Sequence, residues 1–342
     1  MHGNGFRRRL SFLLGLASLL GLADALARPV AAAAQGTPLG PLFWEEGSPL
    51  QRISMTPGME IADPVRPGTV AWEVWLGYSN IFEQDSTRTH VLFLDLERLI
   101  TTATLRWGVR EGLEAGARLT FESTGPGILD TFISEWHQML GLGNANRERY
   151  PAFRYDQVLK DDRGNIRLRI PRRTLGLEDV RLFAKWRIAG GPAAARALSL
   201  RAVARIPTAQ NVVGGERSDL ALLALGRTRW GAFHLHGMAG VSTVRASSDL
   251  ADIMSPAGWY LTLALERPLL PCLSGVVEVA AATAKIRGFN DPEIDGSPVS
   301  VLFGLVGTAG HGWRWEAGFQ EDIPADKPSI DFTLGLGLGR SF

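Results

Sequence analysis

The sequence predicts an all-β fold: a transmembrane antiparallel up-and-down β-barrel of about 12 strands, with one short helix in a long loop. Segments of roughly ten residues alternate apolar and polar side chains, which is the length of a tilted membrane-spanning strand. The connections alternate between tight links and longer polar loops, as they do in outer-membrane barrels. Tryptophans beside the tight links predict an aromatic girdle at one membrane interface, formed by Trp107, Trp186, Trp230, Trp313 and Trp315.

The amino terminus has the pattern of a secretory signal peptide. Three arginines at 7–9 precede the apolar run 10–22, and small residues follow as far as Ala34. The apolar run is too short to span a bilayer. We therefore expect residues 1–34 to be removed and the mature chain to be exported.

The charges of the mature chain nearly balance. The 342 residues include 36 basic and 35 acidic ones, and residues 1–34 hold four Arg and one Asp, which leaves 32 basic and 34 acidic residues. This balance argues against nucleic acid as a partner. The single cysteine, Cys272, cannot form an internal disulfide. A secreted chain of this kind, rich in Gly and Trp, is typical of a bacterial envelope protein.

Each predicted strand has one complete apolar face. In the first strand Val70, Trp72 and Val74 alternate with Ala71 and Glu73, and the last strand alternates leucine with glycine. An even number of strands places both ends of the barrel chain in the periplasm. Strands are predicted near 69–79, 90–109, 112–122, 176–189, 197–207, 218–229, 232–244, 257–267, 273–285, 297–307, 312–321 and 329–342.

The second predicted strand is unusually long and its apolar residues change parity. Leu92 and Leu94 occupy even positions, whereas Leu105 and Trp107 occupy odd ones. A β-bulge near 98–100 would explain the change of face. On that interpretation His90 lies in phase with Leu92 and faces outward near the outer rim.

The rest of the chain divides into a lead-in and the barrel. Segment 35–67 contains six prolines and is predicted to be a non-strand amino-terminal segment, which lies in the periplasm or enters the barrel from below. Residues 68–342 are predicted to form the barrel, with a long helix-bearing loop at 123–175. Inside that loop, 128–140 has helical spacing of apolar residues, and Asp130 can charge the helix start. We predict a lid or plug over the barrel mouth, with an apolar stripe of Phe132, Ile133, Trp136, Met139 and Leu140.

The chain resembles an uncharacterised family of outer-membrane barrels, the domain of unknown function 3187. The matching stretches are "GPLF" at 40–43, "SPL" at 48–50, "LDLE" at 94–97, "WGVREGLEAG" at 107–116, "GPGILDTFISEWHQMLGL" at 125–142 and "GLEDVRL" at 176–182. The resemblance implies a barrel in the outer membrane of a Gram-negative bacterium and implies no activity. The terminal Phe342, in phase with the outward residues, resembles the signal that the outer-membrane barrel assembly machinery recognises.

Charged and histidine side chains on the inward faces are the candidate functional residues. The basic ones concentrate on the middle strands, which favours an anion-selective pore wall, whereas a closed interior with Arg–Glu pairs across the lumen is the alternative. His234 and His236 point the same way but no third metal ligand is visible, so we expect polar lining and no metal or cofactor. The predicted lumen-lining residues are Glu73, Glu114, Arg118, Glu122, Arg181, Lys185, Arg187, Arg201, Arg205, His234, His236, Glu266, Glu278, Arg314, Glu316 and Asp331.

These features favour a passive channel for small, possibly anionic, solutes. A closed barrel with a structural or docking role is the second hypothesis. A lipid-modifying enzyme is the least favoured, because no partnered serine motif accompanies His90, and we expect no enzymatic activity. Besides a small solute, the expected partners are outer-membrane lipid and lipopolysaccharide, whose phosphates suit the basic residues of the long loop: Arg147, Arg149, Arg154, Lys160, Arg163, Arg167, Arg169, Arg172 and Arg173.

Overall fold

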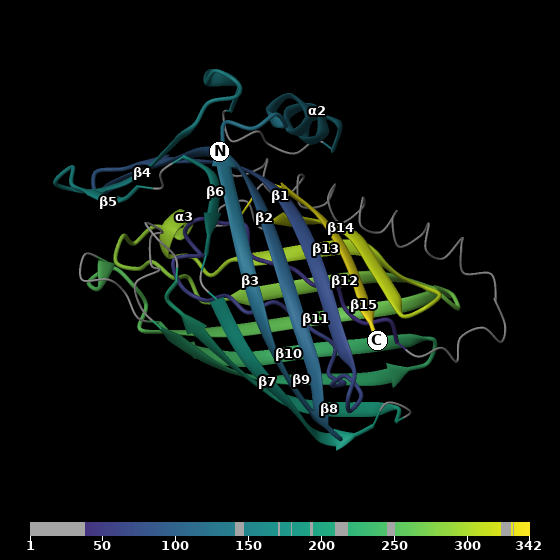
Figure 1. Cartoon of the computed structure of the whole chain (residues 1–342). Coiled ribbons are helices and arrows are strands. Elements are labelled where there is room, and N and C mark those ends of the chain that lie inside the picture. The colour runs from purple at the N-terminus through teal and green to yellow at the C-terminus, as the bar shows by residue number, and fades with distance from the viewer. Residues whose placement is uncertain are drawn as a thin grey trace.

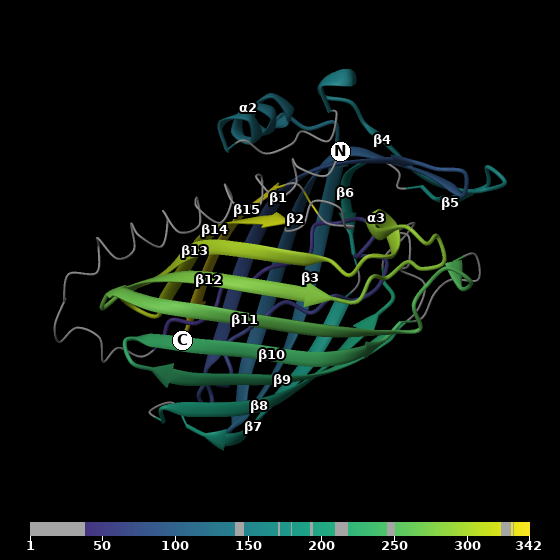
Figure 2. The same cartoon turned by 180° about the vertical axis from the view of Figure 1, so that it is seen from behind.

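Twelve antiparallel strands close into a barrel in the computed structural model, which confirms the predicted fold class and strand number (Figures 1 and 2). The structure describes residues 38–140, 147–169, 172–178, 180–191, 194–208, 218–244, 250–322, 330 and 332–342, so the predicted signal peptide lies outside it. The barrel strands are β1 (Val70–Ser86), β2 (His90–Arg110), β3 (Leu113–Gly125), β7 (Val180–Gly190), β8 (Arg196–Ile206), β9 (Asp219–Trp230), β10 (Phe233–Thr243), β11 (Ala257–Leu270), β12 (Leu273–Ala282), β13 (Val299–Ala309), β14 (Trp313–Asp322) and β15 (Phe332–Ser341).

The barrel has up-and-down topology and closes between its first and last strands. Val74 of β1 aligns with Ala103 of β2 on one side and with Leu338 of β15 on the other. β3 pairs with both β2 and β7, which completes the ring. Closure leaves the ring without an open sheet edge, so the strand N–H and C=O groups can be satisfied inside a bilayer.

The outer face of the barrel is apolar. Leucines and valines alternate outward along the strands and are exposed, among them Leu105, Leu222, Leu263 and Leu336. An exposed apolar band of this extent is stable in lipid and not in water, and the protein is an outer-membrane β-barrel. None of the described helices is long and apolar enough to cross a membrane.

The two ends of the barrel differ. At one end, here the turn end, tight connections such as 111–112, 231–232 and 271–272 join the strands. β1 starts at this end and β15 finishes there, where the Phe342 N–H donates to the Val70 carbonyl at 2.9 Å. The exposed Trp107, Trp186 and Trp230 also lie close to it. Short turns face the periplasm in outer-membrane barrels, so the opposite end, here the loop end, faces the outside.

The structure corrects the prediction of a bulge in the second strand. β1 and β2 pair without a register shift from Val70–Trp107 to Ser86–Val91, and even-numbered residues of β2 face inward throughout. Leu92 and Leu94 are buried because the loop end of the barrel is filled with apolar side chains, not because the strand changes face. His90 is consequently buried, contrary to the outward position predicted from the supposed bulge.

Several short elements project beyond the ring at the loop end (Figure 1). The outer part of β2 pairs with β4 (Asp156–Asp161), which pairs in turn with β5 (Ile166–Leu168). β6 (Arg173–Leu177) continues beside β3, and the short helix α3 (Pro292–Asp295) lies between β12 and β13. Helix α2 (Asp130–Leu140), followed by the 3-10 turn Arg147–Arg149, forms within the predicted long loop.

The interior of the barrel is occupied by the chain that precedes β1. Residues 38–67 form a coil with turns and no strand, drawn in purple inside the ring (Figures 1 and 2). Its apolar residues form a cluster with inward side chains of the barrel wall, such as Trp75, Leu223 and Leu302. The segment therefore enters the barrel, which is one of the two positions predicted for it.

Candidate functional site

Segment 38–67, here the inner segment, runs into the barrel from the turn end and returns to it. Near its start, the Leu39 N–H donates to Glu266, which lies toward the turn end of β11, at 2.8 Å. In its middle, the Met55 N–H donates to Asp219, the first residue of β9 at the loop end, at 3.1 Å. The chain then comes back to enter β1. Both ends of the inner segment are thus attached on the periplasmic side.

Aromatic side chains anchor the inner segment to the first and last strands. The rings of Phe43 and Trp44 pack edge-on against Trp75 of β1, with centroids 5.8 and 5.3 Å apart. Gly335 of β15 leaves room for Trp44, because a Cβ atom at that position would lie 2.4 Å from the indole ring. At Gly335 the glycine–leucine alternation of β15 therefore has a packing reason, because this glycine faces the inner segment while the neighbouring leucines face lipid.

The carboxylate of Glu60 lies among four cations of the barrel wall. Its oxygens are 2.6 Å from Arg118 Nη2, 3.0 Å from Arg201 Nη2, 3.6 Å from Lys185 Nζ and 3.8 Å from Arg106 Nη2. The Glu60 side chain is 2% exposed. A buried carboxylate in such surroundings is held as the anion by charge-assisted hydrogen bonds.

A second carboxylate of the inner segment, Glu45, binds the next group of cations. Arg181 Nη1 donates to both of its oxygens at 2.9 Å, and Arg118 Nη1 is 3.5 Å away. Arg52, from the same segment, contacts Glu45 at 3.3 Å and also pairs with Glu178 of the wall. Arg118 thus lies between Glu45 and Glu60 and connects the two clusters.

Hydrogen bonds from wall side chains to the backbone of the inner segment complete its attachment. Ser199 Oγ donates to the Ala62 carbonyl at 2.6 Å, and Lys185 Nζ donates to the Ile61 carbonyl at 3.2 Å. Arg227 pairs with Asp63 at 2.5 Å. No strand of the described barrel pairs with this segment, so side chains carry the whole attachment.

A small cavity separates the inner segment from one side of the wall. A cavity of about 60 Å³ lies between it and β11 to β14, lined by Trp44, Glu46, Glu278 and Gln320. Such a volume holds a few water molecules and no larger solute. Among the described residues, the inner segment and the inward side chains of β11 to β14 therefore fill this part of the lumen.

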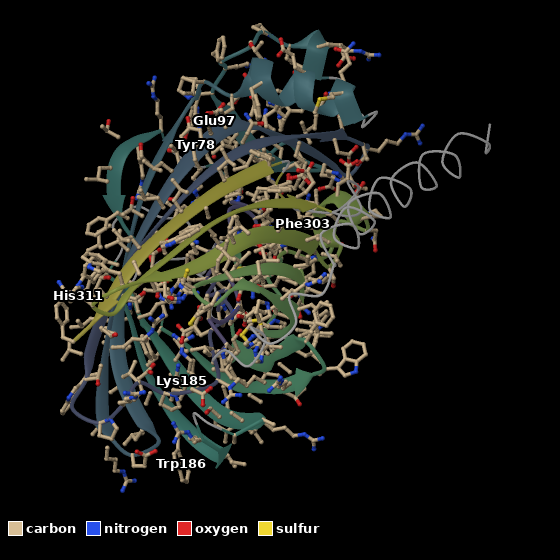
Figure 3. The ribbon with its side chains drawn as sticks, turned by 90° about the vertical axis from the view of Figure 1, so that its right-hand side faces the viewer. Tyr78, Glu97, Lys185, Trp186, Phe303 and His311 are labelled. Carbon is tan, nitrogen blue, oxygen red and sulfur yellow. The ribbon has the colours of Figure 1, made fainter. Side chains whose placement is uncertain are left out.

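Most of the sequence-predicted lumen residues are buried in the barrel interior. Lys185 points into the barrel while its neighbour Trp186 points away from it (Figure 3). Arg187 and Arg314 are partly buried, and Asp331 lies outside the described residues. The others are buried: Glu73, Glu114, Arg118, Glu122, Arg181, Lys185, Arg201, Arg205, His234, His236, Glu266, Glu278 and Glu316.

His236 belongs to a hydrogen-bond network of the wall. Its Nε2 lies 2.9 Å from Glu266, whose carboxylate also accepts from Ser274 Oγ and from the inner segment. His234 lies two residues away and is also buried. His236 thus helps to position the carboxylate that receives the start of the inner segment.

Sequence reasoning missed several residues of this site, and Arg98, Arg106, Glu45 and Glu60 show why. Arg98, which donates to the Gly47 carbonyl of the inner segment at 3.1 Å, falls at the position of the supposed bulge, which obscured its inward phase, whereas Arg106 has the inward phase of the neighbouring lumen residues and was overlooked. A single even-numbered phase from His90 to Arg110 would have identified them. Glu45 and Glu60 lie in a segment without periodicity, and their carboxylates amid apolar residues and prolines were the available signal.

Helix α2 lies at the loop end, above the rim (Figures 1 and 2). Its first residue, Asp130, accepts hydrogen bonds from Asn80 at 3.0 Å and Arg147 at 2.9 Å. Ile133 is buried, whereas Phe132 and Met139 are 46% and 68% exposed. The side chains of Trp136 and Leu140 lie outside the described residues. The lid role of this helix stays a prediction.

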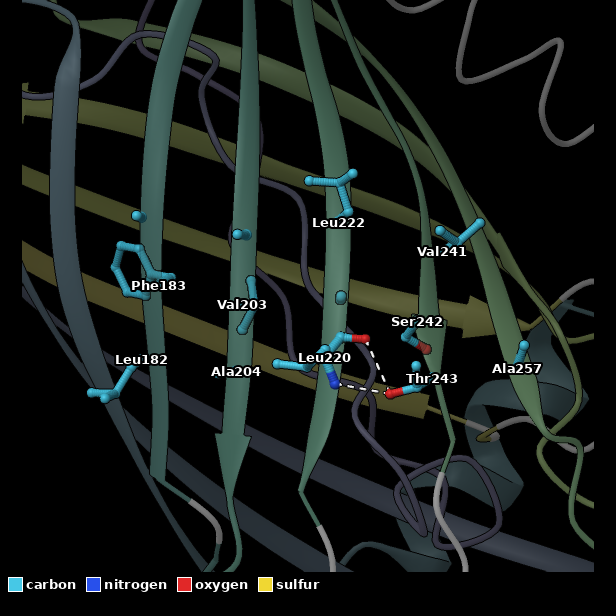
Figure 4. Close-up of a pocket in the computed structure, with 13 residues that line it drawn as sticks. Leu182, Phe183, Val203, Ala204, Leu220, Leu222, Val241, Ser242, Thr243 and Ala257 are labelled. Atoms are coloured by element: carbon cyan, nitrogen blue, oxygen red, sulfur yellow. Dashed lines mark hydrogen bonds between the residues drawn. The ribbon is translucent and has the colours of Figure 1, made fainter.

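A shallow apolar depression lies on the outer face, across β7 to β11 (Figure 4). Exposed Leu182, Leu220 and Leu222 line it together with the small Ala204. The Thr243 hydroxyl accepts from the Leu220 N–H at 3.0 Å. This depression opens toward lipid and is separate from the lumen.

Comparison with known proteins agrees with this architecture. Residues 25–342 match the family described as protein of unknown function (DUF3187). The chain belongs to this family. No curated protein matches it.

Among solved structures, the chain is similar to the COG4313 outer membrane channel from Pseudomonas putida F1. The TM-score is 0.53 at 13% identity, over 84% of this chain and all of that one. The translocator domain of the autotransporter NalP from Neisseria meningitidis gives a TM-score of 0.43 at 12% identity, over 82% of this chain and 91% of that one. At these identities the first likeness shows a shared barrel fold.

Proposed function

We propose that this protein is a passive outer-membrane channel for small solutes, and that the inner segment 38–67 keeps it closed. The observation that carries the proposal is the attachment of this segment. It enters and leaves at the same end and shares no strand hydrogen bonds with the wall. Its rearrangement or exit toward the periplasm would therefore open the lumen without breaking the barrel ladder.

The charges of the wall favour an anionic solute. The inner segment contributes Glu45, Glu46, Glu60 and Asp63 to the interior, against Arg52, whereas its Arg66 is exposed. When these carboxylates leave, the cations of β2, β3, β7 and β8 face the open lumen. A pore lined by Arg and Lys selects anions. The wall residues in question are Arg98, Arg106, Arg118, Arg181, Lys185, Arg201 and Arg205, opposed on neighbouring positions by Glu73, Glu114 and Glu122.

Planar-bilayer conductance tests the proposal. The full mature chain should show rare, discrete openings, because the closed state is stabilised by the inner segment. A variant without residues 38–66 should conduct persistently and prefer anions. If that variant inserts with heat-modifiable migration and conducts without anion preference, the assignment of the solute class is wrong.

A closed structural barrel is the second candidate. Its support is the density of buried ion pairs around Glu60 and Glu45, which bind the inner segment to the wall. On this hypothesis the full chain never opens, at any voltage or solute concentration, although the shortened variant conducts. Discrete openings of the full chain exclude it.

The proposal also gives helix α2 and the basic residues of the long loop a role at the outer side of the barrel. We assign the helix to the rim as an outer cover, in series with the inner segment. Arg149, Arg163, Arg169 and Arg172 are exposed in the same long loop, at the end that faces lipopolysaccharide. Contact with its phosphates would hold this cover against the membrane surface.

A further inference from the structure

Three potential metal ligands from separate parts of the chain meet at the loop end. His90 Nε2 lies 2.6 Å from Asp85 Oδ2 and 3.7 Å from Asp291 Oδ2. The three ligand atoms all lie within 4.8 Å of one another. Asp85 and His90 come from the β1–β2 hairpin, and Asp291 immediately precedes α3 between β12 and β13. The cluster therefore joins two loops on different sides of the barrel mouth.

The histidine ring is oriented for binding through Nε2. Its other nitrogen, Nδ1, is 3.0 Å from Thr87 Oγ1 and 3.1 Å from Thr89 Oγ1, so a proton on Nδ1 can be donated to a hydroxyl oxygen. The side chain is fully buried, and Phe289 packs edge-on against the ring at 5.6 Å. Metal-binding histidines characteristically donate their second N–H in this way, which fixes the ring and the tautomer.

One oxygen of each carboxylate, Asp85 Oδ2 and Asp291 Oδ2, lies near His90 Nε2. Asp291 Oδ1 accepts from the Glu293 N–H at 2.9 Å and caps α3, which directs Oδ2 toward His90. Asp85 approaches the same nitrogen from the hairpin. One imidazole N–H can satisfy only one of two carboxylates, whereas a divalent cation neutralises both.

We propose that Asp85, His90 and Asp291 form a binding site for a divalent transition-metal ion, with Zn²⁺ as the best match. One imidazole and two carboxylates supply three of the four ligands that zinc takes, and water can supply the fourth. The Asp85 and Asp291 side chains are 22% and 18% exposed, so the site is reachable from the outside. Calcium is a poorer match, because it requires six to eight oxygen ligands.

The bound metal would clamp the barrel mouth. It would tie the β1–β2 hairpin to the α3 loop, next to the apolar cluster that contains Leu92, Phe289 and Ile294. The inner segment reaches this cluster through Leu50 and Ile53. Metal binding therefore stabilises the outer closure, and it does not depend on the proposed channel activity.

The test is zinc titration of the refolded full-length mature chain, prepared without a histidine tag. Calorimetry should find one site per chain, and Co²⁺ should give the visible absorption of a tetrahedral complex. His90→Ala should abolish both signals. Asp291→Asn should weaken zinc binding at least about tenfold while its side chain still caps α3. The matched control is His311→Asn in a tight turn at the opposite end, where the backbone φ is 63°, which asparagine tolerates.

Each variant is first checked for heat-modifiable migration, so that loss of folding is not mistaken for loss of binding. One zinc site that disappears in His90→Ala and weakens in Asp291→Asn, but persists in His311→Asn, supports the site. Absence of stoichiometric binding by the full chain overturns it. Binding that is unchanged in both folded ligand variants overturns it as well, and leaves His90 and Asp85 as a simple hydrogen-bonded pair.

Discussion

Replacing Glu60 by Gln should open the channel while leaving the barrel folded. The substitution keeps the size of the side chain and removes the charge that faces Arg118, Arg201, Lys185 and Arg106 at 2.6 to 3.8 Å. Removing one partner of a buried ion pair costs about 3–5 kcal/mol, because the remaining charge is left in a dry site. In the open state the wall cations are hydrated, so this cost falls mainly on the closed state.

The expected effect follows from that free energy. A cost of about 3 kcal/mol to the closed state raises the open-to-closed ratio by roughly a hundredfold, at about 1.4 kcal/mol per tenfold change. Glu60 takes no part in the hydrogen bonds between the barrel strands. The temperature at which the barrel unfolds, measured by its heat-modifiable migration on a gel, should therefore stay the same. Single-channel recording in a planar bilayer measures the open probability directly.

A surface ion pair provides the control. Glu111 pairs with Arg187 at 2.6 Å, but its side chain is 76% exposed in a tight turn. Exposed pairs contribute about 0–1 kcal/mol, so Glu111→Gln should change the open probability by less than about fivefold. The reasoning is refuted if Glu60→Gln inserts normally and its open probability equals that of Glu111→Gln.

Three further predictions concern packing, the outer cover and assembly. Gly335→Val should place side-chain atoms against the Trp44 ring, destabilise the closed state by about 1–3 kcal/mol and therefore raise conductance. The control is Gly237→Val on the outer face of the barrel. Equal conductance of the two variants contradicts the packing argument. Deletion of 130–140 should expose the loop end to added protease but leave the lumen closed, since the inner segment remains; persistent conductance would instead make α2 the principal plug. Deletion of Phe342 should slow membrane insertion and accumulate unfolded chain in the periplasm, and unchanged outer-membrane levels would argue against an assembly signal.

The barrel itself was predictable because its pattern is local. Along each strand, residues that face lipid alternate with residues that face the interior, as in β15, where leucine alternates with glycine. Short turns recur at one end, and an even strand number returns the chain to the side on which it started. These features need no knowledge of which residues meet in space, and the structure confirms them.

The phase of β2 shows where local reasoning failed. The rule that apolar residues face lipid holds only where the other side of the strand faces water or polar groups. Beyond the membrane, Leu92 and Leu94 face an interior filled with apolar side chains, so the same residue types point inward. The direction in which such apolar side chains point is decided by the tertiary surroundings of the strand, and it cannot be read from the strand sequence alone.

The sequence by itself thus determined the membrane barrel, its strand number and the charged character of its interior. Only the tertiary structure decided what those charges do. Glu60 approaches Arg118 and Arg201, and His90 approaches Asp291, across long stretches of chain that have no shared periodicity. An irregular segment carries no repeating pattern from which its partners can be inferred. Its place inside the barrel follows from the complementary charges and shapes of many wall strands, which exist together only after the barrel has closed.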